Sequence, residues 1–298
     1  MKKTNLLFNI FLSITLFLSV IALIFASLSL SLAYSETIAN IKVNSPFSII
    51  FIIFLSLSVL LPVVQAFVIK DYKITRAKEN TIALKIASVL VICALAVLSV
   101  YDFTMATKSL FDSAFPFEAW KFLRIIMAIL FSISMILKSF LSKARIPSAI
   151  RHALSISPVA WTLFSVLAIY FSKSAAPVPE VFKILFSLLY IFGALFFLYD
   201  FKWISLTSNT KFYIAITTIF TSFTFIVSLS SLIGLMFGGL SSDHTIINAV
   251  EMATAFMLGV FGLAKILSIK RAIRVTAKQE VEKSEHSPEE NKKNQSKK

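Results

Sequence analysis

The sequence predicts an all-α fold: a polytopic transmembrane helix bundle of about eight spans. Hydrophobic residues make up 57% of the 298-residue chain and charged residues only 15%, and the mean hydropathy is +0.85. Almost every charged residue lies between long apolar runs rather than inside them. Because soluble domains are about one quarter charged, these observations favour a chain that lies in the lipid bilayer.

Eight apolar runs are long enough to serve as membrane spans, since a helix needs about 20 apolar residues to cross roughly 30 Å of hydrocarbon. The runs are residues 5–33, 47–69, 82–100, 120–141, 156–172, 181–200, 212–237 and 246–268. Residues 1–270 are therefore expected to form one transmembrane domain. The first run is too long for the core of a typical signal peptide, so we expect a first span or signal anchor, with a cleaved signal as the alternative.

The basic residues indicate how the spans are oriented. Lysine and arginine concentrate at residues 2–3, 70–78, 138–151, 202–211 and 270–278, which are alternate loops of an eight-span chain. Cytoplasmic loops are the ones that carry an excess of these residues. We therefore predict a multi-pass protein of the cell membrane with both the N and the C terminus in the cytoplasm.

Two loops and the tail have further expected roles. Residues 101–121 are rich in aromatic residues and are expected to lie along the outer membrane interface. The basic inner loop 138–155 is expected to contact anionic lipid headgroups, with Pro158 in the first turn of the fifth span. Residues 271–298 alternate lysine and glutamate without an apolar period, which predicts a disordered, charged cytoplasmic tail.

Composition and missing motifs disfavour several functional classes. The net charge of +14 follows the loops of one side, so we expect no nucleic acid partner. Cys93 is the only cysteine, which excludes an internal disulfide and a cysteine metal site. The sequence contains no nucleotide-binding, zinc-protease or serine-hydrolase motif. We therefore predict no catalytic residue, no cofactor and no metal ligand.

Six polar residues within the predicted spans are the candidate site residues, because ionisable groups inside a membrane are costly and often functional. They are Glu251, Arg124, Lys183, Gln65, Asp200 and Lys265. The charged ones lie within a turn or two of a span end, where long side chains snorkel or form structural pairs. Arg124 or Lys183 is expected to neutralise Glu251, and Asp200 is expected to pair with Lys265 or Lys85.

Weaker polar features lie in the second and seventh spans. Pro62 is expected to kink the second span and to free a carbonyl group, and Gln65 to hydrogen-bond to a neighbouring helix. The hydroxyl residues at 217–224 are expected to serve helix packing, with a polar cleft as the alternative. Because the chain has only six glycines, serine and alanine are expected to make the close contacts between helices.

Residues 157–233 resemble uncharacterised multi-pass membrane proteins of clostridial-type bacteria. The stretches that carry the resemblance are SPVAWTLFSVLAIYF, KILFSLLYIFGALFFLYDFKW and TKFYIAITTIF. The resemblance covers about a quarter of the chain and implies a bacterial cell membrane, but it implies no activity.

Three functional hypotheses remain open. The first is a non-enzymatic scaffold, sensor or accessory subunit that acts with a protein partner or as a homo-oligomer, since motifs and mid-span charges are missing. The alternative is a permease for an apolar or weakly polar solute, which Pro62, Gln65 and the seventh span favour. The last is a membrane enzyme that acts on lipid at the outer face. Its candidate residues are Asp102, Asp112, Glu118, Asp243, His244 and Glu251.

Overall fold

Eight α-helices make up most of the described part of the chain. The computed structural model describes residues 2–32, 34–35, 40–41, 45–69, 81–111, 119–141, 147–171, 180–204, 210–236 and 245–295. The helices are α1 (Lys2–Leu32), α2 (Pro46–Val68), α3 (Ile82–Phe111), α4 (Ala119–Ser139), α5 (Ser148–Phe171), α6 (Glu180–Ile204), α7 (Thr210–Met236) and α8 (Thr245–Gln295). Two short strands, β1 (Tyr34–Ser35) and β2 (Asn40–Ile41), pair antiparallel between α1 and α2.

Each of the eight helices contains a stretch that is long and apolar enough to cross a membrane. The stretches are Leu6–Leu30, Pro46–Val68, Ile82–Thr107, Ala119–Ser139, Ser148–Phe171, Ile184–Lys202, Thr210–Gly234 and Ala249–Ile273. Within the described residues, the predicted all-helical fold with eight candidate spans is confirmed.

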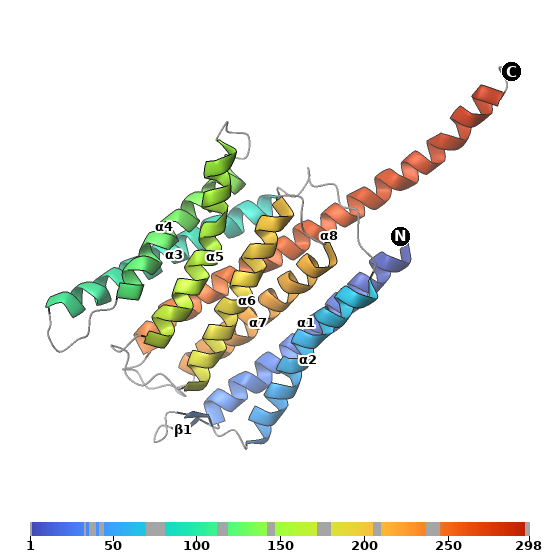
Figure 1. The fold of residues 1–298 in the computed structure, drawn as a ribbon. Helices are drawn as coiled ribbons and strands as arrows, with labels where there is room; N and C mark the ends of the chain where they lie inside the picture. The colour runs from blue at the N-terminus through green and yellow to red at the C-terminus, as the bar shows by residue number, and fades with distance from the viewer. Residues whose placement is uncertain are drawn as a thin grey trace.

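Six of the helices form a closed ring. Each of α3 to α7 packs against the next helix along the chain, and α8 packs back against α3. The helices α4, α6 and α8 are therefore alternate members of the ring (Figure 1). Contacts among these three helices cross the interior of the ring.

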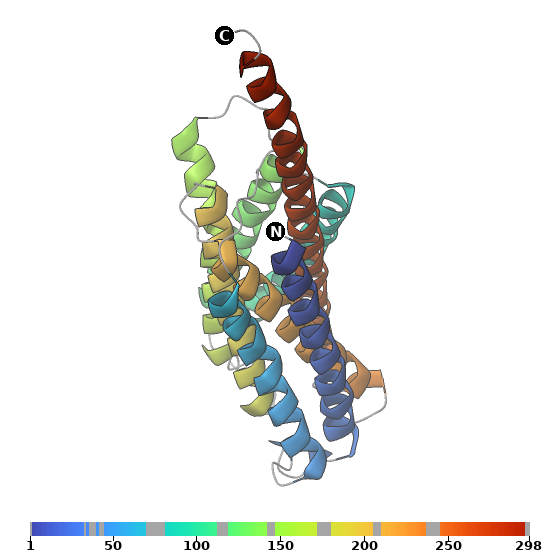
Figure 2. The same cartoon turned by 90° about the vertical axis from the view of Figure 1, so that its right-hand side faces the viewer.

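The remaining two helices lie outside the ring. α1 and α2 pack against each other, as Figure 2 shows, and both also pack against α7. α7 is consequently the most buried of the eight candidate spans, and α2 is the least buried. The exposed residues of α2 include Ile53, Leu60 and Phe67, a surface that suits hydrocarbon rather than water. α2 also continues without a break through Pro62.

The hydroxyl residues of α7 bond to their own helix. Thr217, Thr218, Thr221 and Thr224 are buried, and each donates to the carbonyl oxygen four residues earlier at 2.6–2.9 Å. A hydroxyl that is satisfied in this way needs no partner on another helix. The arrangement favours the packing role that the sequence predicts for these residues.

α3 is longer than the predicted third span. It continues to Phe111, so residues 101–111 belong to a helix, and the expected interfacial loop at 101–121 is wrong for that part. Residues 112–118 lie outside the described chain. Asp102 does not end the helix, because its carboxylate is buried against a cation from α4, described below.

α5 begins earlier than predicted. It starts at Ser148, and Lys138 lies in the last turn of α4, so much of the expected inner loop 138–155 is helical. Pro158 therefore lies inside α5 rather than in its first turn. Proline has no N–H to donate to the carbonyl of Leu154. The hydroxyl of Ser157 donates to that oxygen instead, at 2.6 Å, which explains how the helix tolerates the proline.

The backbone of α8 continues as a helix to Gln295 and projects beyond the bundle (Figure 1). This segment covers most of residues 271–298, which the composition predicts to be a disordered tail. The projecting part has no neighbouring helix to pack against in the figure, and helical stability in proteins comes mainly from such packing. The division into a membrane domain and a disordered tail stays a prediction.

Two glycines of α8 allow it to approach α7 closely. A Cβ atom at Gly259 would lie 3.2 Å from Cγ2 of Thr224, and one at Gly262 would overlap Oγ1 of Thr221. Glycines three residues apart on one helix thus face threonines three residues apart on the other. Small residues at such contacts let helix backbones come together where no hydrophobic effect drives association.

Serine and alanine make close contacts between other helices, as the sequence predicts. The hydroxyls of Ser29 and Ser48 lie 2.6 Å apart between α1 and α2. Those of Ser88 and Ser139 lie 2.8 Å apart between α3 and α4. Alanines of α1 pack in a small cluster with α2 and α7. The scarce glycines therefore supplement this packing rather than replace it.

We expect Gly262→Ala to lower the free energy of unfolding by about 1–3 kcal/mol, the usual range for overpacking. The new methyl group would displace the Thr221 hydroxyl, which now donates to the carbonyl of Thr217. Thermal unfolding of the purified protein in detergent measures the effect. Gly259→Ala is the matched control and should cost less, and adding Thr221→Ala to Gly262→Ala should restore part of the loss. Equal losses for the two glycine variants would contradict this account.

Candidate functional site: two charged networks inside the helix ring

A first cluster of buried charges, which we call the Arg124 network, joins α3, α4, α6 and α8. Arg124 donates from Nε and Nη2 to the two carboxylate oxygens of Asp102, at 2.7 and 2.5 Å. Its Nη1 donates to both oxygens of Glu251, at 3.0 and 3.1 Å. The hydroxyl of Tyr190 also donates to Glu251. One guanidinium thus binds two carboxylates from two different helices.

Arginine suits this position because its planar guanidinium presents five N–H donors in a rigid fork. Two of them form a bidentate pair with Asp102, the strongest geometry for an arginine and a carboxylate. The side chains of Arg124 and Asp102 are 5% and 1% exposed, and that of Glu251 is 12% exposed. Lys121, one turn earlier on α4, is also buried.

A second cluster, the Asp200 network, joins α4, α6, α7 and α8 near the other end of the ring. Lys265 of α8 lies 2.8 Å from one carboxylate oxygen of Asp200, and Lys138 of α4 lies 3.5 Å from the other. The hydroxyl of Tyr213 donates to Asp200 at 2.7 Å. Asp200 and Lys265 are buried. In this network one carboxylate binds two cations.

An aromatic layer separates the two networks. The ring of Phe131 on α4 meets that of Phe197 on α6 edge to face, with centroids 5.0 Å apart, and Phe197 lies 6.4 Å from Phe261 on α8. Trp161 of α5 lies 5.7 Å from Phe131 and 5.5 Å from Tyr190. Trp161 is fully buried, and its indole N–H has no hydrogen-bond partner among the described atoms.

The spacing along the helices explains why the layers line up. Arg124 and Lys138 on α4 are 138 − 124 = 14 residues apart, and Phe131 lies midway. Glu251 and Lys265 on α8 are likewise 265 − 251 = 14 residues apart. A spacing of seven residues returns a side chain to nearly the same helix face. At 1.5 Å per residue the networks are about 21 Å apart along these helices, within a hydrocarbon core of about 30 Å.

The structure brings together four of the six candidate residues that the sequence predicts. Glu251 meets Arg124, and Asp200 meets Lys265, as the sequence analysis proposed. Lys85 is not among the described ion-pair partners of Asp200.

The other two candidates lie apart from the networks. Gln65 is buried in α2, outside the ring, and its side-chain oxygen has no hydrogen-bond partner among the described atoms. The side chain of Lys183 lies outside the described residues.

Sequence reasoning missed four members of the networks. Asp102 was placed in a loop, because the third span was predicted to end at residue 100. Lys138 falls inside the predicted span 120–141, but it was assigned to the basic inner loop 138–155. The continuing apolar residues Tyr101 and Phe103 were the signal that α3 goes on. Tyr190 and Tyr213 lie in apolar runs that give no sign of their polar partners.

The networks are suited to holding helices together rather than to chemistry on a substrate. Every charged group in them is bound to an opposite charge, which leaves no activated nucleophile or general base. Among the described residues, no group of three or more His, Cys, Asp or Glu side chains is arranged to hold a metal ion. The outer residues proposed for a lipid enzyme, other than Asp102 and Glu251, lie outside the described chain.

Comparisons with known proteins add no family to this picture. No protein-family model matches the chain, and neither a curated protein nor a solved structure matches it.

We expect Arg124→Gln to destabilise the protein by about 3–5 kcal/mol, because it leaves two buried carboxylates without a counter-ion. Glu251→Gln should cost less, about 1.5–3 kcal/mol, the range for a hydrogen bond to a charged group. Glutamine keeps an oxygen that can accept from Arg124 and Tyr190. Thermal unfolding in detergent ranks the two variants, and the reverse order would contradict the assigned roles.

Asp200→Asn is expected to cost about 3–5 kcal/mol, because it leaves Lys138 and Lys265 without a buried anion. Adding Lys265→Met removes one of those charges, so the double variant should be more stable than Asp200→Asn alone. Lys202→Gln, an exposed change in the last turn of the same helix, is the control and should stay within about 0.5 kcal/mol of the parent. Additive losses at Asp200 and Lys265 in the same unfolding assay would refute the coupling.

Proposed function

We propose that this chain is a permease that moves an apolar or weakly polar solute through the interior of the six-helix ring. The observation that carries the proposal is the presence of two charged networks, one toward each end of the ring. The same three alternate helices, α4, α6 and α8, contribute to both. The space between the networks is filled by aromatic side chains.

The cost of the networks argues for a moving part rather than a static one. Taking an ion out of water costs several kcal/mol, and well-packed apolar residues usually stabilise a fold at least as well as a buried ion pair. Charges inside a membrane commonly mark a transport path. In a scaffold, sensor or accessory subunit, the first expectation from the sequence, these six charged side chains would only hold helices together, which apolar packing does at lower cost.

Each network acts as a gate in this proposal. Moving α4 away from α8 at the first end breaks the contacts between Arg124 and Glu251, while Arg124 keeps Asp102 of the adjacent α3. Moving α6 away from α8 at the second end breaks the contact between Asp200 and Lys265. Because about 21 Å separates the gates, one can stay closed while the other opens, as a carrier requires.

The interior limits the chemistry of the solute. Between the gates the described side chains are mostly apolar, with an aromatic layer at Phe131, Phe197 and Phe261. The hydroxyls of Thr162 and Ser165 donate to their own helix. The indole N–H of Trp161, which lies in the aromatic layer, has no hydrogen-bond partner among the described atoms, and neither do the hydroxyls of Ser187 and Ser222. We therefore expect an apolar or weakly polar solute that carries a hydrogen-bond acceptor.

The membrane and the orientation follow from the charge pattern. We infer that the protein lies in the cell membrane with both termini in the cytoplasm, because most basic residues lie in the loops on the same side of the bundle as the termini. The Arg124 network then lies toward the outside, and the Asp200 network lies toward the cytoplasm. This assignment gives each gate a side from which it can be tested.

Cysteine accessibility tests the two gates without a known solute. Replacing Cys93, the only cysteine, by serine gives a background for single reporters. Ala128→Cys lies between Arg124 and Phe131, and Ser134→Cys between Phe131 and Lys138; both parent residues are buried. Glu251→Gln should raise modification of the first reporter by an impermeant, charged thiol reagent from outside. Asp200→Asn should raise modification of the second from the cytoplasmic side.

The expected rise is about tenfold for each 1.4 kcal/mol removed from the closed state. Ile129→Cys, at an exposed position next to Ala128 in the same span, faces the lipid in this proposal; it is the control and should stay unmodified in all backgrounds. Modification rates of the two reporter cysteines that stay unchanged in both gate variants would favour the scaffold hypothesis. Reactivity that rises from both sides in either variant would mean a loosened bundle, and would also count against the permease.

A further inference from the structure

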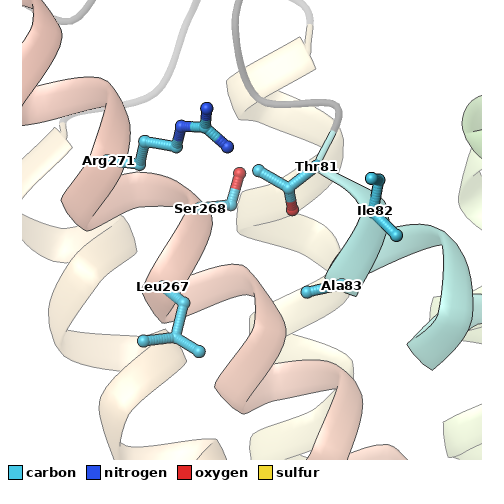
Figure 3. Close-up of a pocket in the computed structure, with 6 residues that line it drawn as sticks. All are labelled: Thr81, Ile82, Ala83, Leu267, Ser268 and Arg271. Carbon is cyan, nitrogen blue, oxygen red and sulfur yellow. The ribbon is translucent and has the colours of Figure 1, made fainter.

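A pocket of about 270 Å³ lies between the start of α3 and a late turn of α8. Its lining residues are Thr81, Ile82, Ala83, Leu267, Ser268 and Arg271. Figure 3 shows the guanidinium of Arg271 extending from α8 toward α3, with the side chains of Ser268 and Thr81 in the space between the helices. The two proposed gates include none of these residues.

The polar side of the pocket suits a phosphate group. The guanidinium of Arg271 is able to donate two parallel hydrogen bonds to phosphate oxygens. The hydroxyl of Thr81 accepts from the N–H of Leu84 at 3.3 Å and keeps its own hydrogen to donate. The side chain of Ser268 also lines the pocket, and none of the six lining residues is acidic. The pocket also lies at the beginning of α3, where the partial positive charge of the helix end adds to that of Arg271.

The apolar side of the pocket and its depth point to a lipid. Ile82 is 77% exposed and Leu267 is 52% exposed, so two large apolar side chains flank the polar groups. Ile82 is also the first residue of its candidate span, and Arg271 lies within two residues of the end of another. The pocket is therefore at the depth where the headgroup of a bilayer lipid meets its acyl chains.

We propose that this pocket binds the phosphate of an anionic phospholipid. Arg271, Thr81 and Ser268 hold the phosphate, while Ile82 and Leu267 lie against the acyl chains. Lys270, next to Arg271, adds positive charge that favours an anionic headgroup over a zwitterionic one. The proposal does not depend on the permease activity, because it needs neither gate to move.

Lipid binding to the full-length protein in mild detergent tests the proposal, with native mass spectrometry as the readout. The probes are phosphatidylglycerol, phosphatidylcholine and glycerol phosphate, which carries the phosphate without acyl chains. The variants are Arg271→Gln and the double variant Thr81→Ala with Ser268→Ala. Lys270→Gln is the matched control, because it removes the same charge from the residue next to Arg271, and Lys270 is not one of the lining residues.

We expect Arg271→Gln to weaken binding of phosphatidylglycerol about tenfold or more, and Lys270→Gln about twofold or less. The double hydroxyl variant should weaken it several-fold, and phosphatidylcholine should bind the parent more weakly than phosphatidylglycerol. If Arg271→Gln and Lys270→Gln weakened phosphatidylglycerol binding equally, the lipid would be held by diffuse charge attraction, and the proposed binding site would be wrong. Glycerol phosphate that binds as tightly as the lipid would overturn the lipid assignment.

Discussion

The need to pair every charge inside the ring is the constraint on which the arrangement of its helices depends. Neither hydrocarbon nor a packed aromatic layer can solvate a guanidinium or a carboxylate, so each must find its partner on a neighbouring helix. Arg124 therefore brings α3 and α8 to α4, and Asp200 brings α4 and α8 to α6. The aromatic side chains fill the space that these two requirements leave between them.

The same constraint explains what the sequence can and cannot predict. Eight spans are visible because a chain in hydrocarbon must satisfy its backbone within helices of predictable length. Helix adjacency is not visible, because it depends on side-chain packing, so the pair of Arg124 and Glu251 was expected only as a conditional contact. Asp102 and Lys138 were missed for a related reason. A charge close to the end of an apolar run is expected to face water, but each of these two has a buried partner of opposite charge on another helix.

The types of contact divide the bundle into a tightly packed part and a part held by charge. α7 and α8 meet through Gly259 and Gly262, where one added methyl group has no room, and α1 and α2 pack on α7. α3 is tied to α4 by the bidentate pair of Asp102 and Arg124 and by the hydroxyls of Ser88 and Ser139. Across the interior, α4 reaches α8 through an ion pair instead of close backbone packing. In the proposed permease, relative movement of the two parts would break this ion pair and change the packing of α3 against α8.

A boundary between these two parts runs where α3 packs against α8, and the pocket with Arg271 lies on it (Figure 3). A lipid phosphate held there would contact both helices at once. Binding shifts a conformational equilibrium only through a difference in affinity between the two states, and a pocket shared by two moving parts changes shape when they move. In the proposed permease, an anionic lipid that fits the pocket in its present shape would favour the state in which Asp200 is paired with Lys265. By reciprocity, opening the Asp200 gate would weaken lipid binding by the same factor.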